Sequence, residues 1–173
     1  MFLKVMYKKN RKPAIMKISI GCDTSAYTQV SISLADYLEK EKQCEVIKCG
    51  AMAGNDNADY IDAALEVAEM VASKKVDYGI LLCNTGTGVS IIANKVPGVR
   101  AAVCVDCFAA KISKLANNAN VLALSVRYCG ETLLKEIIET WLETHPSSEE
   151  RRMAFHRKTD GVDKKYRKQI QAN

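Results

Sequence analysis

Short apolar runs that alternate with longer segments of helical spacing constrain the fold of this chain more than any other feature of its sequence. The apolar runs are Lys17–Cys22, Cys44–Cys49, Tyr78–Cys83, Val99–Cys104 and Val121–Leu124, and the helical segments that follow them span about 31–42, 59–73, 89–94, 107–115 and 130–144. Runs that are apolar at nearly every position are typical of strands buried on both faces. With right-handed crossovers, this alternation predicts an α/β fold: a three-layer, Rossmann-like, doubly wound sheet of five parallel strands with helices on both faces.

The length of the chain suits one well-buried domain. Its 173 residues, 48% of them hydrophobic, suffice for one core and are too few for two. Residues 16–145 carry the alternation and are the expected Rossmann-like domain. Residues 1–15 are a basic extension that we expect to be disordered or to lie upstream of a natural start at Met16. Residues 146–173 are charged with sparse apolar positions, which predicts an arm that packs on a partner subunit or stays mobile.

Charge and hydropathy argue against nucleic acid and membranes as partners. Five cations within residues 1–15, a segment without an acid, account for the net charge of +5. The tail after Ser148 is locally basic as well, but a basic tail alone is a weak indicator of nucleic-acid binding. No apolar stretch reaches the length of a membrane span, and residues 1–15 lack the apolar core of a signal peptide. We therefore expect neither kind of partner.

Seven cysteines form an odd set that indicates reduced thiols. Cys104 and Cys107 make a single CxxC pair, with no second pair and no nearby histidine to complete a zinc site. Several other cysteines lie inside apolar runs, as is common for reduced thiols in the cytosol. The sequence thus predicts a cytoplasmic protein without a bound metal. The two histidines, His145 and His156, lie in polar segments and are expected at the surface.

One loop between a buried strand and a helix carries a pattern suited to holding negative charge. In Cys83-Asn84-Thr85-Gly86-Thr87-Gly88, alternate glycines let the backbone turn tightly, so that successive N–H groups face one point. A thiol at the edge of such a cradle is favoured as thiolate, which makes Cys83 a candidate base for proton transfer. The alternative is that Cys83 merely closes a buried strand as a small apolar residue. The glycine spacing differs from that of a dinucleotide-binding loop.

The motifs at the ends of the apolar runs resemble those of the ribose-5-phosphate isomerase B and galactose-6-phosphate isomerase family. The resemblance covers Met16 to about Asp163. Its motifs are Gly21-Cys22-Asp23, Asp59-Tyr60, the loop from Cys83 to Gly88, the long run from Ala93 to Ala101, Asn117 to Val121, and Glu149-Glu150-Arg151. It implies interconversion of an aldose phosphate and a ketose phosphate through a cis-enediolate, without metal or organic cofactor. It also implies a homodimer or homotetramer whose sites lie between subunits.

The resemblance assigns roles to individual residues. Cys83 corresponds to the base that moves a proton between C1 and C2 of the sugar, and Thr85 to the hydroxyl that serves the sugar oxygens. The predicted enediolate cradle consists of Asn84, Gly86, Thr87 and Gly88; the predicted sugar contacts are Asp23, Tyr60 and Asn117; and the predicted phosphate ligands are Arg127 and the partner subunit's Arg151. Bidentate guanidinium contacts suit the geometry of a phosphate.

Four positions depart from the pattern that the resemblance implies. Thr24 and Ala116 stand where histidines are expected, Phe155 stands where the arm is expected to carry an arginine, and Asn84 stands where glycine is common. The resemblance implies that the histidine replaced by Ala116 opens the sugar ring, and losing such an acid–base group typically costs about 10²–10⁴-fold in rate on a cyclic sugar but not on an open-chain one. Thr24 and Phe155 remove two implied phosphate contacts, so together these changes predict an isomerase of reduced or altered activity. Two other hypotheses stay open: a non-catalytic paralogue that binds a phosphorylated metabolite, and one subunit of a heteromeric isomerase formed with a homologue.

Overall fold

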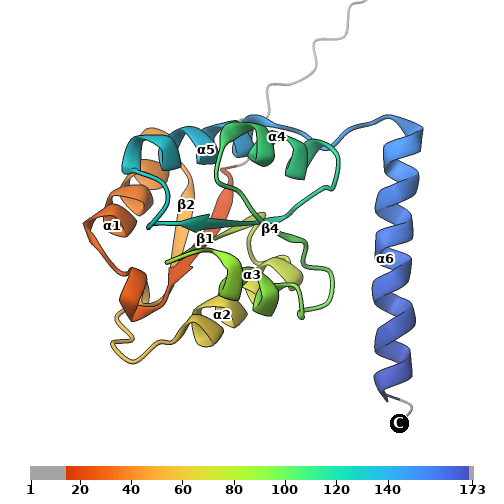
Figure 1. The fold of residues 1–173 in the computed structure, drawn as a ribbon, viewed down its shortest axis with the longest axis horizontal. Coiled ribbons are helices and arrows are strands. Elements are labelled where there is room, and N and C mark those ends of the chain that lie inside the picture. The colour runs from red at the N-terminus through yellow and green to blue at the C-terminus, as the bar shows by residue number, and fades with distance from the viewer. Residues whose placement is uncertain (1–14, 172–173) are drawn as a thin grey trace, which may run out of the picture.

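A computed structural model, which describes residues 15–171, contains a sheet of five parallel strands (Figure 1). The strands are β1 (Lys17–Cys22), β2 (Glu45–Gly50), β3 (Tyr78–Cys83), β4 (Ala101–Val103) and β5 (Val121–Ser125). They are ordered β2-β1-β3-β5-β4, and each neighbouring pair is parallel. The predicted doubly wound sheet is therefore confirmed. The predicted extension, residues 1–15, lies outside the described residues except for Ile15.

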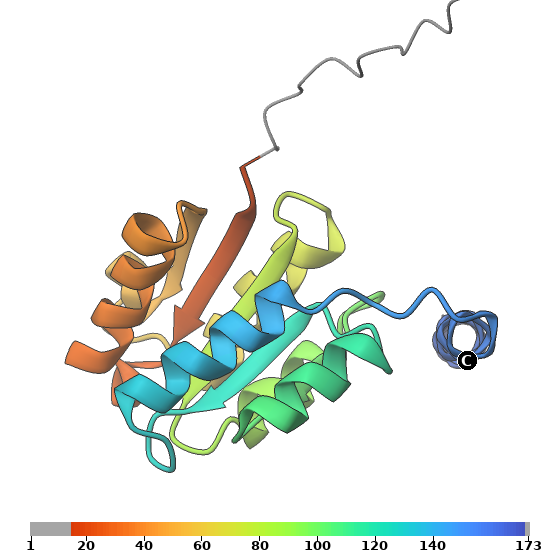
Figure 2. The same cartoon turned by 90° about the horizontal axis from the view of Figure 1, so that it is seen from above.

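Helices cover both faces of the sheet, as the alternation predicted. They are α1 (Gln29–Asp36), which continues as a π-helical turn over Tyr37–Glu41, α2 (Tyr60–Ala72), α3 (Thr87–Ala93), α4 (Cys107–Leu115), α5 (Glu131–Glu143) and α6 (Glu150–Gln171). One face is covered by α1, α4 and α5, and the other by α2 and α3 (Figures 1 and 2). Within residues 15–171, no helix is both long and apolar enough to cross a membrane.

The central strands are apolar at successive positions because they are buried from both sides. In β1, Ile18 and Ile20 are fully buried in the core cluster beneath α1 and α5. Gly21 faces the other way, where a Cβ atom would lie only 2.9 Å from Val67 Cγ2 on α2. This close approach of helix and strand leaves no room for a side chain at residue 21.

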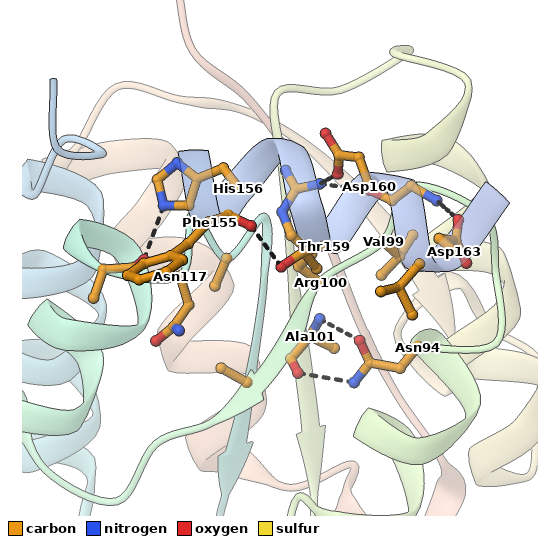
Figure 3. A pocket seen from close by; sticks show the side chains of 15 residues that line it. Asn94, Val99, Arg100, Ala101, Asn117, Phe155, His156, Thr159, Asp160 and Asp163 are labelled. Carbon is orange, nitrogen blue, oxygen red and sulfur yellow. Dashed lines mark hydrogen bonds and ion pairs between the residues drawn. The ribbon is translucent and has the colours of Figure 1, made fainter. Parts of the chain in front are cut away.

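The edge strand β4 is shorter than the predicted run Val99–Cys104. At its start, side chains bind the backbone N–H groups, while the carbonyl oxygen of Arg100 accepts from the N–H groups of Asn120 and Val121. The N–H of Arg100 donates to Asn120 Oδ1 at 2.7 Å, and the N–H of Ala101 donates to Asn94 Oδ1 at 2.8 Å. Asn94 also donates from Nδ2 to the carbonyl oxygen of Ala101 at 2.9 Å (Figure 3). The strand therefore has only three residues.

The arm contains one long helix, α6, which stands beside the β4 edge of the sheet (Figures 1 and 2). His156 Nε2 lies 2.8 Å from the carbonyl oxygen of Ala116, Asp160 pairs with Arg100 at 3.5 Å, and Asp163 accepts from the N–H of Gly98 at 3.3 Å. The spacing of residues 156, 160 and 163 places them on one face of the helix. The arm thus contacts its own chain, and packing on a partner subunit stays a prediction.

Candidate functional site

A pocket of about 320 Å³ opens where β1 and β3 end. It is lined by Asp23, Thr24, Ser25, Asn57, Ala58, Asp59, Tyr60, Cys83 and Asn84. Because carboxyl ends of parallel strands meet at one edge of the sheet, loops from distant parts of the sequence converge there. Four residues predicted for the site line this one pocket: Asp23, Tyr60, Cys83 and Asn84.

Cys83 differs from the other thiols of the core in its position. It ends β3, is 9% exposed and lines the pocket. By contrast, burial raises the pKa of Cys22 to about 12, and the neighbouring carboxylate of Asp23 adds to this effect. Burial likewise raises the pKa of Cys49 to about 12. Those two thiols stay protonated at neutral pH, and among the cysteines of the described residues the pocket is lined by Cys83 alone.

Glycines shape the loop that follows Cys83, which we call the cradle loop (residues 84–88). Gly86 has a left-handed backbone with φ of +77°, and a Cβ atom there would lie 3.3 Å from Val103 Cγ1. At Gly88, a Cβ atom would lie 3.1 Å from the ring of Tyr60, so the absence of a side chain lets this ring approach the loop. Within the loop, the N–H of Thr87 donates to Thr85 Oγ1 at 3.3 Å.

A buried serine that sequence reasoning missed supports the cradle loop from below. Ser125 ends β5 and is fully buried. Its hydroxyl donates to the carbonyl oxygen of Asn84 at 2.5 Å and accepts from the N–H groups of Arg127 and Tyr128 at 3.2 and 3.0 Å. The one feature of the sequence that pointed to this serine is that it follows the apolar run Val121–Leu124 directly. Ser125 joins the cradle loop to the turn that carries the predicted phosphate ligand Arg127.

A second serine, also missed, organises the carboxylate of Asp23. Asp23 is 7% exposed, and its Oδ1 accepts from the N–H groups of Ser25 and Ala26 at 2.8 and 3.1 Å. The same oxygen accepts from the hydroxyl of Ser25 at 2.5 Å, and Asn84 Nδ2 donates to that hydroxyl at 3.0 Å. Ser25 therefore connects the loop after β1 with the cradle loop after β3.

The remaining predicted residues lie elsewhere on the chain. Asn117 lines a different pocket of about 380 Å³ between α6 and the β4 edge, together with Ala116 and Phe155 (Figure 3). Arg151 lies in the first turn of α6, with its guanidinium carbon 5.9 Å from the ring centroid of Phe155. Arg127 is exposed in the turn after β5. A single chain therefore does not bring Asn117 and Arg151 into the pocket that Cys83 lines.

Both histidines were expected at the surface, and His156 meets this expectation only in part. His145 is exposed, but His156 is partly buried and bonded to the backbone of Ala116, because α6 runs back past the end of α4. A carbonyl oxygen only accepts hydrogen bonds, so Nε2 of His156 carries the proton. Across residues 15–171, no group of three or more His, Cys, Asp or Glu side chains is placed to hold a metal ion.

Comparisons with known proteins agree with this architecture. The sequence model of the family described as Ribose/Galactose Isomerase matches residues 18–158. Ribose-5-phosphate isomerase B of Escherichia coli is 40% identical over 126 residues, 73% of this chain and 83% of that protein. D-erythrulose-4-phosphate isomerase of Pectobacterium atrosepticum is 40% identical over 129 residues, 75% of this chain and 84% of that protein. A solved structure of Clostridium thermocellum ribose-5-phosphate isomerase B matches with a TM-score of 0.80 at 44% identity, over 87% of this chain and 99% of that chain.

Proposed function

Because this chain belongs to the ribose/galactose isomerase family, we propose that it interconverts an aldose phosphate and a ketose phosphate, with Cys83 as the base. The relatives named above are sugar-phosphate isomerases, and their names differ in the sugar phosphate they act on. The observation that carries the proposal is the pocket that unites Cys83, Asp23 and Tyr60 beside the cradle loop.

The proposed reaction moves one proton between carbons and one between oxygens. The thiolate of Cys83 takes the proton from C2 of the open-chain aldose, and the electron pair of that bond moves through C1 onto the C1 oxygen. Backbone N–H groups of residues 84–88 stabilise the charge that develops on the enediolate. The hydroxyl of Thr85 passes a proton from the C2 oxygen to the C1 oxygen. The thiol of Cys83 then returns its proton to C1 as the carbonyl forms at C2.

The rest of the substrate is assigned to groups from two chains. Asp23 and Tyr60 bind sugar hydroxyls in the pocket of Cys83, and Arg127 binds the phosphate. The partner subunit's Asn117 and the partner subunit's Arg151 complete the site. What supports this assignment is that Asn117 lies beside α6 and Arg151 lies on it, and neither lines the pocket of Cys83 in their own chain. A homodimer or homotetramer follows as the proposed assembly.

Three departures favour a narrowed or altered substrate range. Ala116 and Phe155 place apolar groups next to Asn117, and Thr24 supplies a neutral hydroxyl in the pocket of Cys83. We therefore propose that the protein turns over an open-chain sugar phosphate faster than one that must first open a ring. The same apolar groups favour a second candidate, a protein that binds a phosphorylated metabolite without turnover, alone or as one subunit of a heteromer.

Deuterium exchange tests the proposed base. We expect the purified protein in deuterated water to exchange the C2 hydrogen of ribose 5-phosphate and, faster, that of the open-chain aldose D-erythrose 4-phosphate. The Cys83→Ala variant should lose about 10²–10⁴-fold of this rate, because it lacks the base. Cys107→Ala is the matched control, since Cys107 is a free, half-buried thiol outside the pocket, and it should exchange at the wild-type rate.

Three other outcomes of these measurements would each contradict one part of the proposal. Exchange retained in Cys83→Ala would show that another group is the base. Tight binding of both sugar phosphates by calorimetry without exchange would establish the binding protein instead. Exchange that appears only after a second homologous chain is added would establish the heteromer.

A further inference from the structure

We propose that Ser25 is a positioning residue for this reaction, which holds the carboxylate of Asp23 and the first residue of the cradle loop, Asn84, in one fixed arrangement. The inference rests on the proposed function and concerns a residue outside the predicted site. It follows from a chain of hydrogen bonds that crosses the pocket from the loop after β1 to the loop after β3.

The directions of these hydrogen bonds can be derived from the groups involved. The ionised carboxylate of Asp23 only accepts, so at 2.5 Å the hydroxyl proton of Ser25 points to Asp23 Oδ1. The oxygen of Ser25 is then left to accept, and it does so from Nδ2 of Asn84 at 3.0 Å. The hydroxyl of Ser25 therefore donates to Asp23 on one side of the pocket and accepts from Asn84 on another side.

These contacts leave one face of the Asp23 carboxylate for a substrate. Oδ1 accepts three hydrogen bonds, from the N–H and hydroxyl of Ser25 and from the N–H of Ala26. The described chain offers no hydrogen bond to Oδ2 of Asp23. With Oδ1 fixed by three donors, the carboxylate cannot rotate freely, so Oδ2 has a defined position from which to accept from a sugar hydroxyl.

The same serine sets where the cradle loop lies relative to that oxygen. The side chain of Asn84 is tied to Ser25, and the carbonyl of Asn84 is tied to Ser125 at 2.5 Å. Asn84 is thereby held from two sides, by β1 through Ser25 and by β5 through Ser125. Correct distance between a binding group and the reacting atoms governs the rate of an enzyme, so loss of the Ser25 hydroxyl should lower turnover as well as affinity.

A double-mutant cycle at Ser25 and Asn84, with Ser25→Thr as an additional variant that keeps the hydroxyl, tests this role. We expect Ser25→Ala to lower kcat/KM about tenfold, mostly through kcat, because it removes a hydrogen bond to a charged group. Asn84→Ala should lower kcat/KM by a similar factor. The double variant should have the same kcat/KM as the less active single variant, because both changes break one chain of contacts. Ser25→Thr keeps the hydroxyl and should restore most of the activity.

A control variant and a stability measurement separate positioning from folding. Ser73→Ala removes a hydroxyl that bonds only to its own helix, and it should leave kcat and KM unchanged. Thermal unfolding of all variants shows whether a loss of activity reflects unfolded protein. Wild-type kcat and KM in Ser25→Ala, or effects of Ser25 and Asn84 that simply add, would overturn the role of Ser25 while leaving the isomerase intact. If wild-type protein exchanges neither aldose phosphate, the proposed function fails and the role of Ser25 fails with it.

Discussion

At the scale of single residues, Lys114 is the most unusual group outside the candidate site. Its side chain is 1% exposed, and Nζ has no hydrogen-bond partner. The ammonium lies between two aromatic rings, 3.1 Å from the centroid of Tyr78 and 3.6 Å from that of Trp141. Burial lowers the pKa of Lys114 to about 7, and the positive charge of Arg100 adds to this effect.

Two opposing effects act on the charge of Lys114. Stacking on aromatic rings favours the ammonium by about 2 kcal/mol when it is desolvated. A pKa lowered from 10.5 to about 7 corresponds to about 5 kcal/mol in the other direction. Burial is therefore the larger effect. In the unfolded chain the amine stays protonated up to a higher pH, so between about pH 7 and 10.5 the unfolded state binds more protons, and stability due to Lys114 rises with pH across this window.

The Lys114→Met variant should abolish this pH dependence. We expect it to be more stable than wild type at pH 6.5, by a few kcal/mol at most, because an apolar chain of similar length replaces a buried unpaired amine. Near pH 9 the difference in unfolding free energy between the variant and wild type should be smaller, because Lys114 is then neutral in the folded wild type. Urea unfolding at both pH values measures the difference, with Lys111→Met as the control, since Lys111 is exposed on the same helix. Equal advantages at the two pH values would contradict the assignment.

At the scale of elements, the arm helix α6 is held to its own chain by polar contacts on one face. His156 bonds the backbone at the end of α4, Asp160 pairs with Arg100, and Asp163 bonds the backbone of Gly98. Pairs that are well exposed contribute little, and both Asp160 and Arg100 keep solvent access. The contact of His156, which is partly buried, should therefore matter more for keeping the helix in place than the pair of Asp160 and Arg100.

Removal of the imidazole should loosen the arm. We expect His156→Ala to raise the rate of protease cleavage in residues 144–149 about fivefold, because a lost hydrogen bond costs about 1 kcal/mol and cleavage follows the population of the open form. Lys158→Ala, an exposed change on the same helix, is the control and should be cleaved at the wild-type rate. Identical cleavage of both variants would show that His156 does not hold the arm.

At the scale of the whole molecule, the predicted site residues divide into two groups. Cys83, Asp23 and Tyr60 line one pocket, whereas Asn117 lines another and Arg151 lies in the first turn of the helix at that second pocket. A symmetric pair of chains brings such groups together twice, once at each of two equivalent sites. The proposed two-chain site requires that each chain hold these two groups of residues apart, as this chain does.

Complementation between two inactive variants tests this arrangement. Cys83→Ala and Arg151→Ala homodimers should each be inactive or strongly impaired. After subunit exchange, one of the two sites in each heterodimer regains both residues, so the mixture should reach about a quarter of wild-type activity. The absence of any recovery, with heterodimers shown to form by mass spectrometry, would mean that both residues serve the same chain's site.

Sequence pattern by itself determined the layers of this fold and the edge at which the pocket lies. Continuous apolar runs indicated strands buried from both sides, and such strands end together at one edge of a parallel sheet. The family resemblance named Asp23, Tyr60 and Cys83 as site residues, and all three line one pocket at that edge. The layers were predictable because hydrophobic periodicity and strand direction are local properties that a short stretch of sequence carries.

Only the tertiary structure decided which polar groups support the pocket. Ser25 meets Asn84 across 59 positions of sequence, and Ser125 meets the same residue across 41. The hydrogen bond of His156 could not be predicted for the same reason, since its partner Ala116 lies 40 positions away. Such contacts depend on how whole elements pack, and no local pattern of residue types encodes them. The sequence therefore located a thiol that lines the pocket, and packing determined which polar groups surround it.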